Sequence, residues 1–349
     1  MRPKRIAICA TQVPFVRGGG EIHVESLQRE LLQRGFEAEL IRLPFKWYPH
    51  SELIKGALAW RLLDLTESDG QKIDMVIATQ FPAYVVKHPN KVVWLIHQFR
   101  QAYDLFGTQY SGLTNSPEDR RIREMIRAID ARTLGEAQRI FTNAKNTANR
   151  LARYNQLHGE ALYHPPKLDD LYHNEQYGDY IFSVGRLNKM KRVALLIEAM
   201  RHTRTGVRCL IAGTGRERDP LQRMIEKARL GDRLTLLGYV DDKRQVELYA
   251  NCMAVFYAPY DEDYGYVTLE AFKSRKPVIT ASDSGGVLEF VEHERTGYVC
   301  ASDAPRQIAA RIDHLYAHRE LCKSMGDAGF EKVKGITWDV VISKLTKGL

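Results

Sequence analysis

Residues 180–191 read YIFSVGRLNKMK, an apolar run that is followed by a glycine and a group of cations. The run Tyr180–Val184 is typical of a buried β-strand, and Gly185 marks a turn at its end. In open parallel sheets, ligands bind beyond the carboxyl ends of the strands. The segment therefore predicts a strand of an α/β fold whose carboxyl end faces a ligand.

Two cations of this segment are candidate ligands for a diphosphate. Arg186 can bind a phosphate through two N–H groups, whereas Lys191 acts as a point charge. Both follow the strand closely enough to hold one diphosphate between them. Taken alone, these residues would also suit a solvated basic loop, because Lys189 and Arg192 lie beside them.

Short apolar runs alternate with helical patterns on both sides of this segment. The expected strands are Arg5–Cys9, Glu37–Leu43, Met75–Ala78, Val92–Ile96, Arg139–Thr142, Tyr180–Val184, Val207–Ala212, Arg233–Leu237, Ala254–Tyr257, Pro277–Thr280 and Gly297–Cys300. The expected helices include Ile22–Arg34, Glu118–Ala137, Val193–Met200, Glu217–Leu230 and Ala304–His318. This alternation predicts parallel sheets that are covered by helices on both faces.

The alternation stops at Tyr163-His164-Pro165-Pro166, where two prolines favour a stiff extended segment. We place the domain boundary there, with doubly wound domains at residues 1–163 and 164–335. Two such domains facing each other would enclose a central cleft. Residues 336–349 hold Trp338 and spaced apolar residues, which predict an amphipathic helix that packs on an apolar surface.

The composition indicates a globular protein outside the membrane. The chain has 349 residues, of which 44% are hydrophobic and 27% charged, a length that suits two domains. No apolar run reaches the ~20 residues of a membrane-spanning helix. The N-terminal run Ile6–Ala10 is shorter than the ~7–15 residues of a signal-peptide core. The five cysteines form no CxxC pair, so we expect a cytoplasmic protein without a zinc site or disulfide framework.

The positive charge is concentrated in the N-terminal half. The net charge is +8, and residues 1–164 hold 23 Lys and Arg against 17 Asp and Glu. Such an excess suits either an anionic partner or a solvated basic surface. The basic segment Arg120–Arg139 is poor in aromatic residues, which argues against nucleic acid. We therefore expect peripheral contact with the inner face of the cell membrane and no nucleic-acid partner.

Residues 262–270, EDYGYVTLE, form a second candidate ligand-binding segment. Gly265 permits a tight turn, and the helix that begins at Tyr266 directs its first backbone amides toward a phosphate. Glu270 lies one turn inside, where its carboxylate can accept bonds from two ribose hydroxyls. Glu262 precedes the helix. Two acids at this spacing would by themselves also suit an exposed acidic loop.

Glycine-rich turns occur at three further strand ends. Gly18-Gly19-Gly20 follows the first strand and leads into a helix, an arrangement that lets backbone N–H groups approach an anion. Ser284-Gly285-Gly286 precedes a second such helix start, and Gly213 and Gly215 follow the strand that ends at Ala212. The first loop is not a GxGxxG motif, so it does not indicate dinucleotide binding.

In this order, the motifs resemble family 4 of the retaining GT-B glycosyltransferases. The matching pieces are the Gly-rich first loop, Gly-Arg-Leu-x-x-x-Lys, Ala-Gly-x-Gly, Glu-x7-Glu and the Gly-Gly helix start. The resemblance covers nearly the whole chain and is most specific over residues 180–300. It implies the GT-B fold, with two Rossmann-like domains facing a cleft, an acceptor-side N-terminal domain and a C-terminal donor domain.

The resemblance also implies a role for each matching residue. Arg186 and Lys191 would bind the donor's diphosphate, Glu270 its ribose, and Glu262 would lie near the transferred sugar. Backbone amides at Gly265, Tyr266 and Val267 would contact sugar or phosphate. His97 would lie near the donor sugar, although a buried strand-end histidine is a serious alternative. The remaining glycines implied as substrate-binding are Gly18, Gly19, Gly20, Gly213 and Gly215.

The implied reaction is retaining transfer from a UDP- or GDP-sugar to a glycan or lipid-linked acceptor, in surface polysaccharide synthesis. Asp261-Glu262-Asp263 mimics the DxD metal motif of another glycosyltransferase fold. That fold lacks the two-domain pattern, so we expect no cofactor and no required metal. Two alternatives are a nucleotide-sugar epimerase of GT-B-like fold and a non-catalytic protein that binds anionic glycan or nucleic acid. Family members often have a closing helix that crosses back to the N-terminal domain. The resemblance implies this role for residues 336–349, and because the chain ends at Leu349 the helix would be short.

Overall fold

The computed structural model describes residues 2–349, which divide into two compact units. The first unit holds the residues up to Lys167 together with Thr337–Leu349, and the second holds Leu168–Ile336. The division falls after Lys167, four residues later than the expected boundary after Tyr163. His164, Pro165 and Pro166 are buried, and His164 packs on Trp94 of the first unit, which keeps the double-proline segment with that unit.

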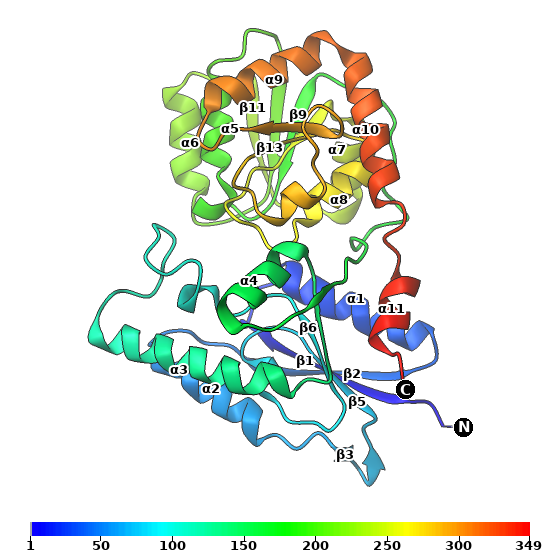
Figure 1. The fold of residues 1–349 in the computed structure, drawn as a ribbon. Helices are drawn as coiled ribbons and strands as arrows, with labels where there is room; N and C mark the ends of the chain where they lie inside the picture. Colours follow the sequence, from blue (N-terminus) through cyan, green and yellow to red (C-terminus); the bar gives the residue numbers. More distant parts are fainter. Residues whose placement is uncertain (1) are drawn as a thin grey trace. The chain divides into compact units, whose positions relative to one another are not determined.

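Each unit is built on a six-stranded parallel sheet, which confirms the expected doubly wound α/β fold (Figure 1). In the first unit the strand order is β2-β1-β5-β6-β7-β8. These strands are β2 (Glu37–Pro44), β1 (Arg5–Gln12), β5 (Met75–Ala78), β6 (Lys91–Leu95), β7 (Arg139–Thr142) and β8 (Glu160–Ala161). A separate antiparallel hairpin joins β3 (Glu67–Ser68) and β4 (Gln71–Lys72).

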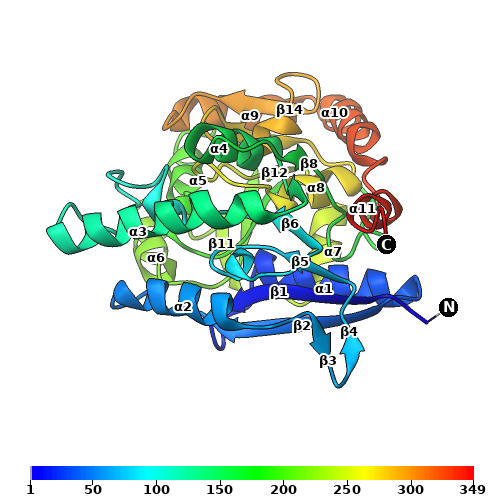
Figure 2. The ribbon, with the colours of Figure 1, turned by 60° about the horizontal axis from the view of Figure 1, so that its bottom comes forward.

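The two faces of the first sheet carry separate hydrophobic cores, because alternate residues of a strand point to opposite faces. Ile6 and Ile8 of β1 pack with α1 (Gly19–Gln33) and α11 (Trp338–Leu345). Ala7 and Cys9 face the core that holds α2 (Ser51–Leu62), α3 (Pro117–Thr133) and α4 (Lys145–Asn155). Figure 1 shows α1 and α2 on opposite sides of this sheet, and Figure 2 shows the β3–β4 hairpin projecting from it.

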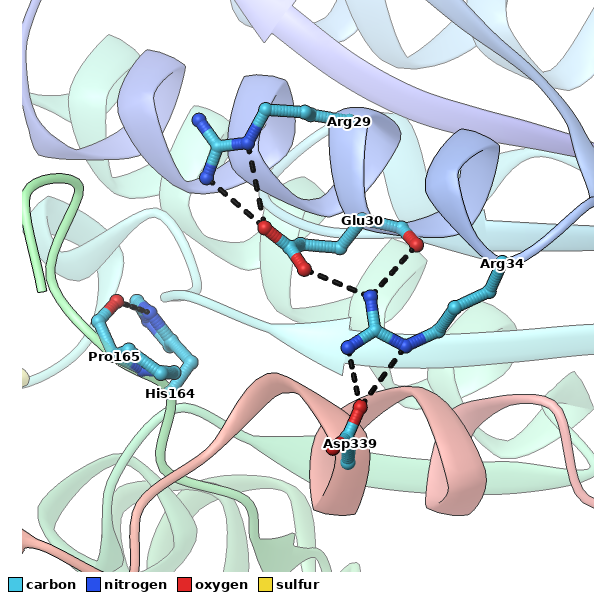
Figure 3. A network of polar contacts seen from close by, with 6 residues as sticks. All are labelled: Arg29, Glu30, Arg34, His164, Pro165 and Asp339. Atoms are coloured by element: carbon cyan, nitrogen blue, oxygen red, sulfur yellow. Dashed lines mark hydrogen bonds and ion pairs between the residues drawn. The ribbon is translucent and has the colours of Figure 1, made fainter. Parts of the chain in front are cut away.

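Helix α11 returns from the end of the second unit and packs beside α1 (Figure 1). Its apolar residues Trp338, Val341, Ile342 and Leu345 join the core on that face of the sheet. Arg34, the residue that follows the last turn of α1, bridges Glu30 and Asp339, as Figure 3 shows. Because the Asp339 side chain is 85% exposed, this ion pair adds little stability, and the buried side chains hold the helix.

In the second unit the strand order is β11-β10-β9-β12-β13-β14. These strands are β11 (Leu234–Gly238), β10 (Arg208–Ala212), β9 (Tyr180–Val184), β12 (Ala254–Phe256), β13 (Val278–Ala281) and β14 (Gly297–Cys300). Counted along the chain this is the order 3-2-1-4-5-6, which reverses direction between β9 and β12. Ligands of such sheets bind at this switch point, beyond the carboxyl ends of the strands.

Helices cover both faces of the second sheet. They are α5 (Val193–Met200), α6 (Arg218–Lys227), α7 (Asp242–Asn251), α8 (Tyr266–Lys273), α9 (Pro305–Ala317) and α10 (Arg319–Val333). Ile181 of β9 faces the core with α5, α6 and α9, whereas Phe182 meets Tyr249 of α7 edge to face at 4.9 Å. Within residues 2–349, no helix is both long enough and apolar enough to span a bilayer.

Candidate functional site

The loop after β9 presents Lys191 because an asparagine closes a short helical turn there. The side chain of Asn188 accepts a hydrogen bond from the backbone N–H of Lys191 at 3.0 Å, which caps the 3-10 turn Lys189–Lys191. Arg192 then takes a left-handed conformation, with φ of 49°, and helix α5 begins. The local sequence therefore ends the strand, turns once and leaves the Lys191 side chain at the carboxyl edge of the sheet.

Lys191 pairs with two residues that follow β12, on the other side of the switch point. Its Nζ lies 2.5 Å from Oε2 of Glu262 and 3.0 Å from the hydroxyl of Tyr257, which is itself hydrogen-bonded to Glu262. The Lys191 and Glu262 side chains are 18% and 25% exposed, so solvent and ligands can reach them. The structure thus brings together two predicted site residues, and adds Tyr257, which the sequence did not single out.

The neighbouring Arg192 stabilises the loops that follow β12 and β13. Its guanidinium makes two bonds to the carboxylate of Asp283, of 2.8 and 2.6 Å, and it also donates to the carbonyl oxygens of Ala258 and Pro259. Arg192 is buried, and every one of these partners follows β12 or β13. Arg192 therefore fixes the loops that hold Glu262, and this role distinguishes it from the exposed Arg186.

Arg186 keeps its side chain in solvent at the carboxyl end of β9. It precedes the short turn that presents Lys191, so both cations belong to the loop that follows β9. An exposed guanidinium at this edge of the sheet can bind the oxygens of an anionic ligand through two N–H groups.

Gly213 and Gly215 lie directly under the β9 loop. A Cβ atom on Gly213 would come within 1.9 Å of the carbonyl oxygen of Gly185, and one on Gly215 within 2.2 Å of that of Leu187. The backbone N–H groups of Gly185 and Leu187 donate to the carbonyl oxygens of Ala212 and Thr214. Close backbone packing thus already accounts for both glycines, and their predicted contact with substrate stays a prediction.

We expect Gly213→Ala to destabilise the second unit by roughly 2 kcal/mol or more, because a side chain at φ of 135° would also overlap the Gly185 carbonyl. The matched control is Gly231→Ala, where an added Cβ meets nothing within 4 Å. Thermal unfolding of the two variants and the parent measures the difference. Equal melting temperatures for both variants would show that the β9 loop tolerates displacement.

Helix α8 begins at the predicted turn. Gly265 caps it in a left-handed conformation, with φ of 78°, and the next residues, Tyr266 and Val267, open the first turn. The first amides of a helix have no partner within it, so those of Tyr266 and Val267 can bind an anion. The following loop packs tightly on this one, because a Cβ on Gly286 would lie 2.1 Å from the Asp263 carbonyl oxygen.

Glu270 lies one turn inside α8, where side chains from two other segments surround its carboxylate. The hydroxyl of Tyr249 donates to Oε2 at 2.7 Å, Tyr172 also hydrogen-bonds the carboxylate, and Gln245 lies at 3.5 Å. The residue as a whole is half-buried, but removal of water from its carboxyl group raises the pKa of Glu270 to about 7. A carboxylate held in this way can accept hydroxyl groups of a ligand without reorganising.

In the first unit, Gly18 caps helix α1, which begins at Gly19, three residues before the expected start at Ile22. The carboxylate of Glu21 accepts a hydrogen bond from the Gly18 N–H at 2.8 Å. That bond occupies one of the amides predicted to meet a diphosphate, so Gly19 and Gly20 are the better placed of the three. Glu21 also brings a negative charge to the start of α1, a feature that the glycine motif alone did not predict.

His97 follows β6 and is half-buried. Its Nδ1 lies 2.8 Å from the carbonyl oxygen of Gln98, which only accepts, so Nδ1 carries the proton and Nε2 is an acceptor in the neutral ring. The buried Gln98 side chain donates to Asn155, which donates to the hydroxyl of Tyr103. This chain of bonds fixes the backbone that orients His97. The His97 side chain is therefore partly accessible to a ligand, and its hydrogen bond to Gln98 fixes the orientation of the ring.

The predicted residues thus form two groups. Arg186, Lys191, Glu262 and Glu270 belong to the second unit, on both sides of its switch point, with cations and helix amides beside acids that can accept hydroxyls. The Gly-rich loop and His97 belong to the first unit. The residues of the second unit offer the cations, helix amides and acids that suit a nucleoside diphosphate.

Comparisons with known proteins agree with this chemistry. Residues 173–332 match the family model of the glycosyl transferases group 1. The human alpha-1,3/1,6-mannosyltransferase ALG2 is 29% identical over 66% of this chain and 63% of its own length. The chain therefore spans under two thirds of that relative. The N-acetyl-alpha-D-glucosaminyl L-malate synthase of Bacillus anthracis is 24% identical over 94% of this chain and 92% of its own length.

Solved structures share the fold over nearly the entire chain. Sucrose-phosphate synthase from Thermosynechococcus elongatus superposes with a TM-score of 0.77 at 17% identity, covering 98% of this chain and 97% of its own. HepE from Anabaena, in complex with UDP and glucose, superposes with a TM-score of 0.70 at 17% identity, covering 99% and 98%. These likenesses concern the fold, which is GT-B.

Proposed function

We propose that this chain, whose residues 173–332 match the model of the glycosyl transferases group 1 and which has the GT-B fold, transfers a sugar from a nucleoside diphosphate sugar to a glycan or lipid-linked acceptor. The observation that carries the proposal is the ion pair between Lys191 and Glu262, which lie on opposite sides of the switch point of the second sheet. Relatives named as sugar transferases and a GT-B neighbour solved with UDP and glucose support this choice.

In this proposal the second unit binds the donor. Arg186 and Lys191 hold the diphosphate, together with the first amides of α8 at Tyr266 and Val267. Glu270 accepts the ribose hydroxyls. Negative charge grows on the diphosphate as the sugar leaves, and preorganised cations and amides stabilise that charge without moving. These groups can neutralise the leaving group by themselves, so we propose that the reaction requires no metal ion.

The fate of the sugar follows from the groups near the diphosphate. Glu262 is held by Lys191 and Tyr257, which makes it a hydrogen-bonding partner of the sugar and a poor nucleophile. We therefore propose attack by the acceptor on the face that the leaving group departs from, with retention of configuration. His97, with Nε2 as an acceptor, would receive a hydrogen bond from a hydroxyl of the donor sugar.

The decisive experiment follows consumption of UDP- and GDP-sugars, with and without a glycan or lipid-linked acceptor, and analyses the products. Acceptor-dependent release of nucleoside diphosphate with an α-linked product from an α-linked donor supports the proposal. Release of a free, isomerised sugar without acceptor would instead identify an epimerase. Binding of glycans without any turnover would identify a carbohydrate-binding protein.

A lipid-linked acceptor in surface polysaccharide synthesis would bring the protein to the cytoplasmic face of the membrane. Helices α2 and α3 lie side by side in the first unit (Figure 1). On α2, Leu58 and Leu62 are 57% and 76% exposed, and on α3 the side chains of Arg120 and Arg121 are exposed. Exposed apolar side chains on one helix and exposed arginines on the neighbouring helix suit the surface of an anionic bilayer.

We expect the protein to float with vesicles that contain anionic lipid, and less so as salt rises. Arg120→Glu with Arg121→Glu should weaken binding roughly tenfold or more, because each cation near such a surface contributes about 1 kcal/mol. Arg218→Glu with Arg306→Glu, in the second unit, is the control. Flotation that is the same with neutral and anionic vesicles would exclude an electrostatic membrane contact.

A further inference from the structure

A pocket of about 240 Å³ opens at the carboxyl edge of the first sheet. Its walls come from the segments that follow β2 and β6, and from residues 112–113. Three aromatic side chains, a leucine and two polar side chains line it, namely Phe45, Trp47, Phe99, Leu113, His50 and Gln101. His97 lies two residues before Phe99, so the segment after β6 contributes both to this pocket and to the candidate site.

The aromatic rings form one connected wall. Phe45 and Trp47 lie nearly parallel, with ring centroids 6.1 Å apart and planes 28° apart, and Phe45 meets Phe99 edge to face at 6.5 Å. The backbone N–H of Phe45 donates to the carbonyl oxygen of Gln12, which ties this wall to the end of β1. Trp47 remains 40% exposed, so part of its ring is available to a ligand.

Hydrogen bonds fix the two polar side chains that line the pocket, His50 and Gln101. Nδ1 of His50 lies 2.5 Å from the carboxylate of Asp119, which also accepts from the backbone N–H and the hydroxyl of Thr114, beside Leu113. The Gln101 amide bonds the backbone of Tyr110 and Gly112. Asp119 and Gln101 therefore fix the pocket's shape while the aromatic surface stays open.

From these features we propose that the pocket binds one sugar ring of the acceptor, against the aromatic wall and beside His50. This inference rests on the proposed transferase function and names the class of group that the acceptor presents. Aromatic faces pack on the apolar C–H faces of a pyranose, and a few polar groups at the rim set its orientation. The ring hydroxyls find polar partners in His50 and Gln101.

The size and charge of the pocket favour a sugar ring over two other occupants. Its volume is below the roughly 300–1,000 Å³ of sites for drug-sized ligands, which suits one ring better than a long isoprenoid chain. No lysine or arginine lines it, so a phosphate group would find no permanent cation there. An isoprenoid chain would also leave His50 and Gln101 without hydrogen-bonding partners on the ligand.

Tryptophan fluorescence can test the pocket directly, because Trp47 is the exposed one of the four tryptophans. Trp60 and Trp94 are 0% exposed and Trp338 is 9% exposed, so acrylamide should quench mainly Trp47. The probes are methyl α-mannoside, methyl α-glucoside, methyl N-acetylglucosaminide and, for a lipid chain, farnesyl phosphate. We expect at least one glycoside to lower acrylamide quenching saturably to the level of the Trp47→Phe variant.

Phe45→Ala removes a wall but keeps the reporter, so the protection of Trp47 should be lost. Leu58→Ala, an exposed apolar residue outside the pocket, should keep it. Protection by farnesyl phosphate alone, or by none of the probes, overturns the inference. Calorimetric titration of UDP and GDP on the same proteins separates the two claims. Intact nucleotide binding with failed protection removes only the sugar pocket, whereas absent nucleotide binding removes the transferase proposal itself.

Discussion

Lys191→Ala is expected to lower sugar transfer by about 100- to 1,000-fold, as the loss of a preorganised group that stabilises transition-state charge does in other enzymes. The Lys191 ammonium lies 2.5 Å from Glu262 and 3.0 Å from Tyr257 in the resting protein. When the donor reacts, charge accumulates on the diphosphate, and an ammonium in this position is attracted more strongly to the product-like state. Turnover should therefore fall more than nucleotide affinity.

Lys189→Ala is the matched control, because it removes the same charge from the same turn at an exposed position. Donor consumption gives the rate, calorimetry gives the affinity for UDP or GDP, and thermal unfolding reports stability. Glu262 is 25% exposed, so water can solvate it when Lys191 is absent, and we expect both variants to stay folded. Equal rate losses in the two variants would mean that the loop acts only through its total charge.

The second large effect concerns Glu270. We expect the Glu270→Gln variant to bind the nucleotide sugar about 10- to 100-fold more weakly than the parent protein does. Hydrogen bonds to a charged group contribute about 1.5–3 kcal/mol, and the amide cannot accept two ribose hydroxyls as the carboxylate does. Because the pKa of Glu270 is raised to about 7, the carboxylate forms only as pH rises through that value. Affinity of the parent should therefore increase between pH 6 and 8, and that of the variant should not.

The stability of the parent has the opposite pH dependence. The folded-state pKa of Glu270, about 7, lies above the usual value of 4.5, so the folded protein binds the proton more tightly. Its contribution to stability is present below pH 4.5 and is lost as pH rises toward 7. Glu270→Gln should thus unfold at a higher temperature than the parent at pH 8, by on the order of 1–3 kcal/mol in free energy, while it binds donor less well.

Titrations should use the nucleotide sugar, because the terminal phosphate of a free nucleoside diphosphate itself titrates near pH 6. Glu226→Gln, an exposed glutamate on α6, serves as the control. A variant that gains stability at pH 8 and keeps the affinity of the parent would show that Glu270 is a strained core carboxyl with no role in binding. A pH-independent affinity of the parent would place the ribose elsewhere.

Much of the architecture could be read from local patterns. The apolar runs at Met75–Ala78, Tyr180–Val184 and Gly297–Cys300 form strands with these same ends, because a buried strand is apolar throughout and glycines or polar residues end it. Helices α2 and α4 were not among the expected ones. Exposed Leu58 and Leu62 blur the apolar periodicity of α2, and α4 is short and basic.

The resemblance to a glycosyltransferase family and the candidate donor residues could also be read from the sequence, because a strand followed by glycine and cations, and a helix start with spaced glutamates, are local arrangements. The residues that contact these candidates in the folded protein could not be predicted from the sequence. Tyr172, Gln245 and Tyr249 reach Glu270 from two other segments, and Arg192 reaches Asp283 across 91 positions. Nothing in the spacing of these residues signals the contact.

The amino-acid sequence by itself determined the elements, their alternation and the ends at which polar residues collect, since backbone propensity and hydrophobic period act over a few residues. The tertiary structure alone decided which loops meet at the switch point and how far the carboxyl group of Glu270 is shielded from water. It also decided how Phe45 and Phe99, from different strand ends, enclose one pocket. Such properties depend on distances between segments that are remote in the chain, and only the packed sheet brings those segments together.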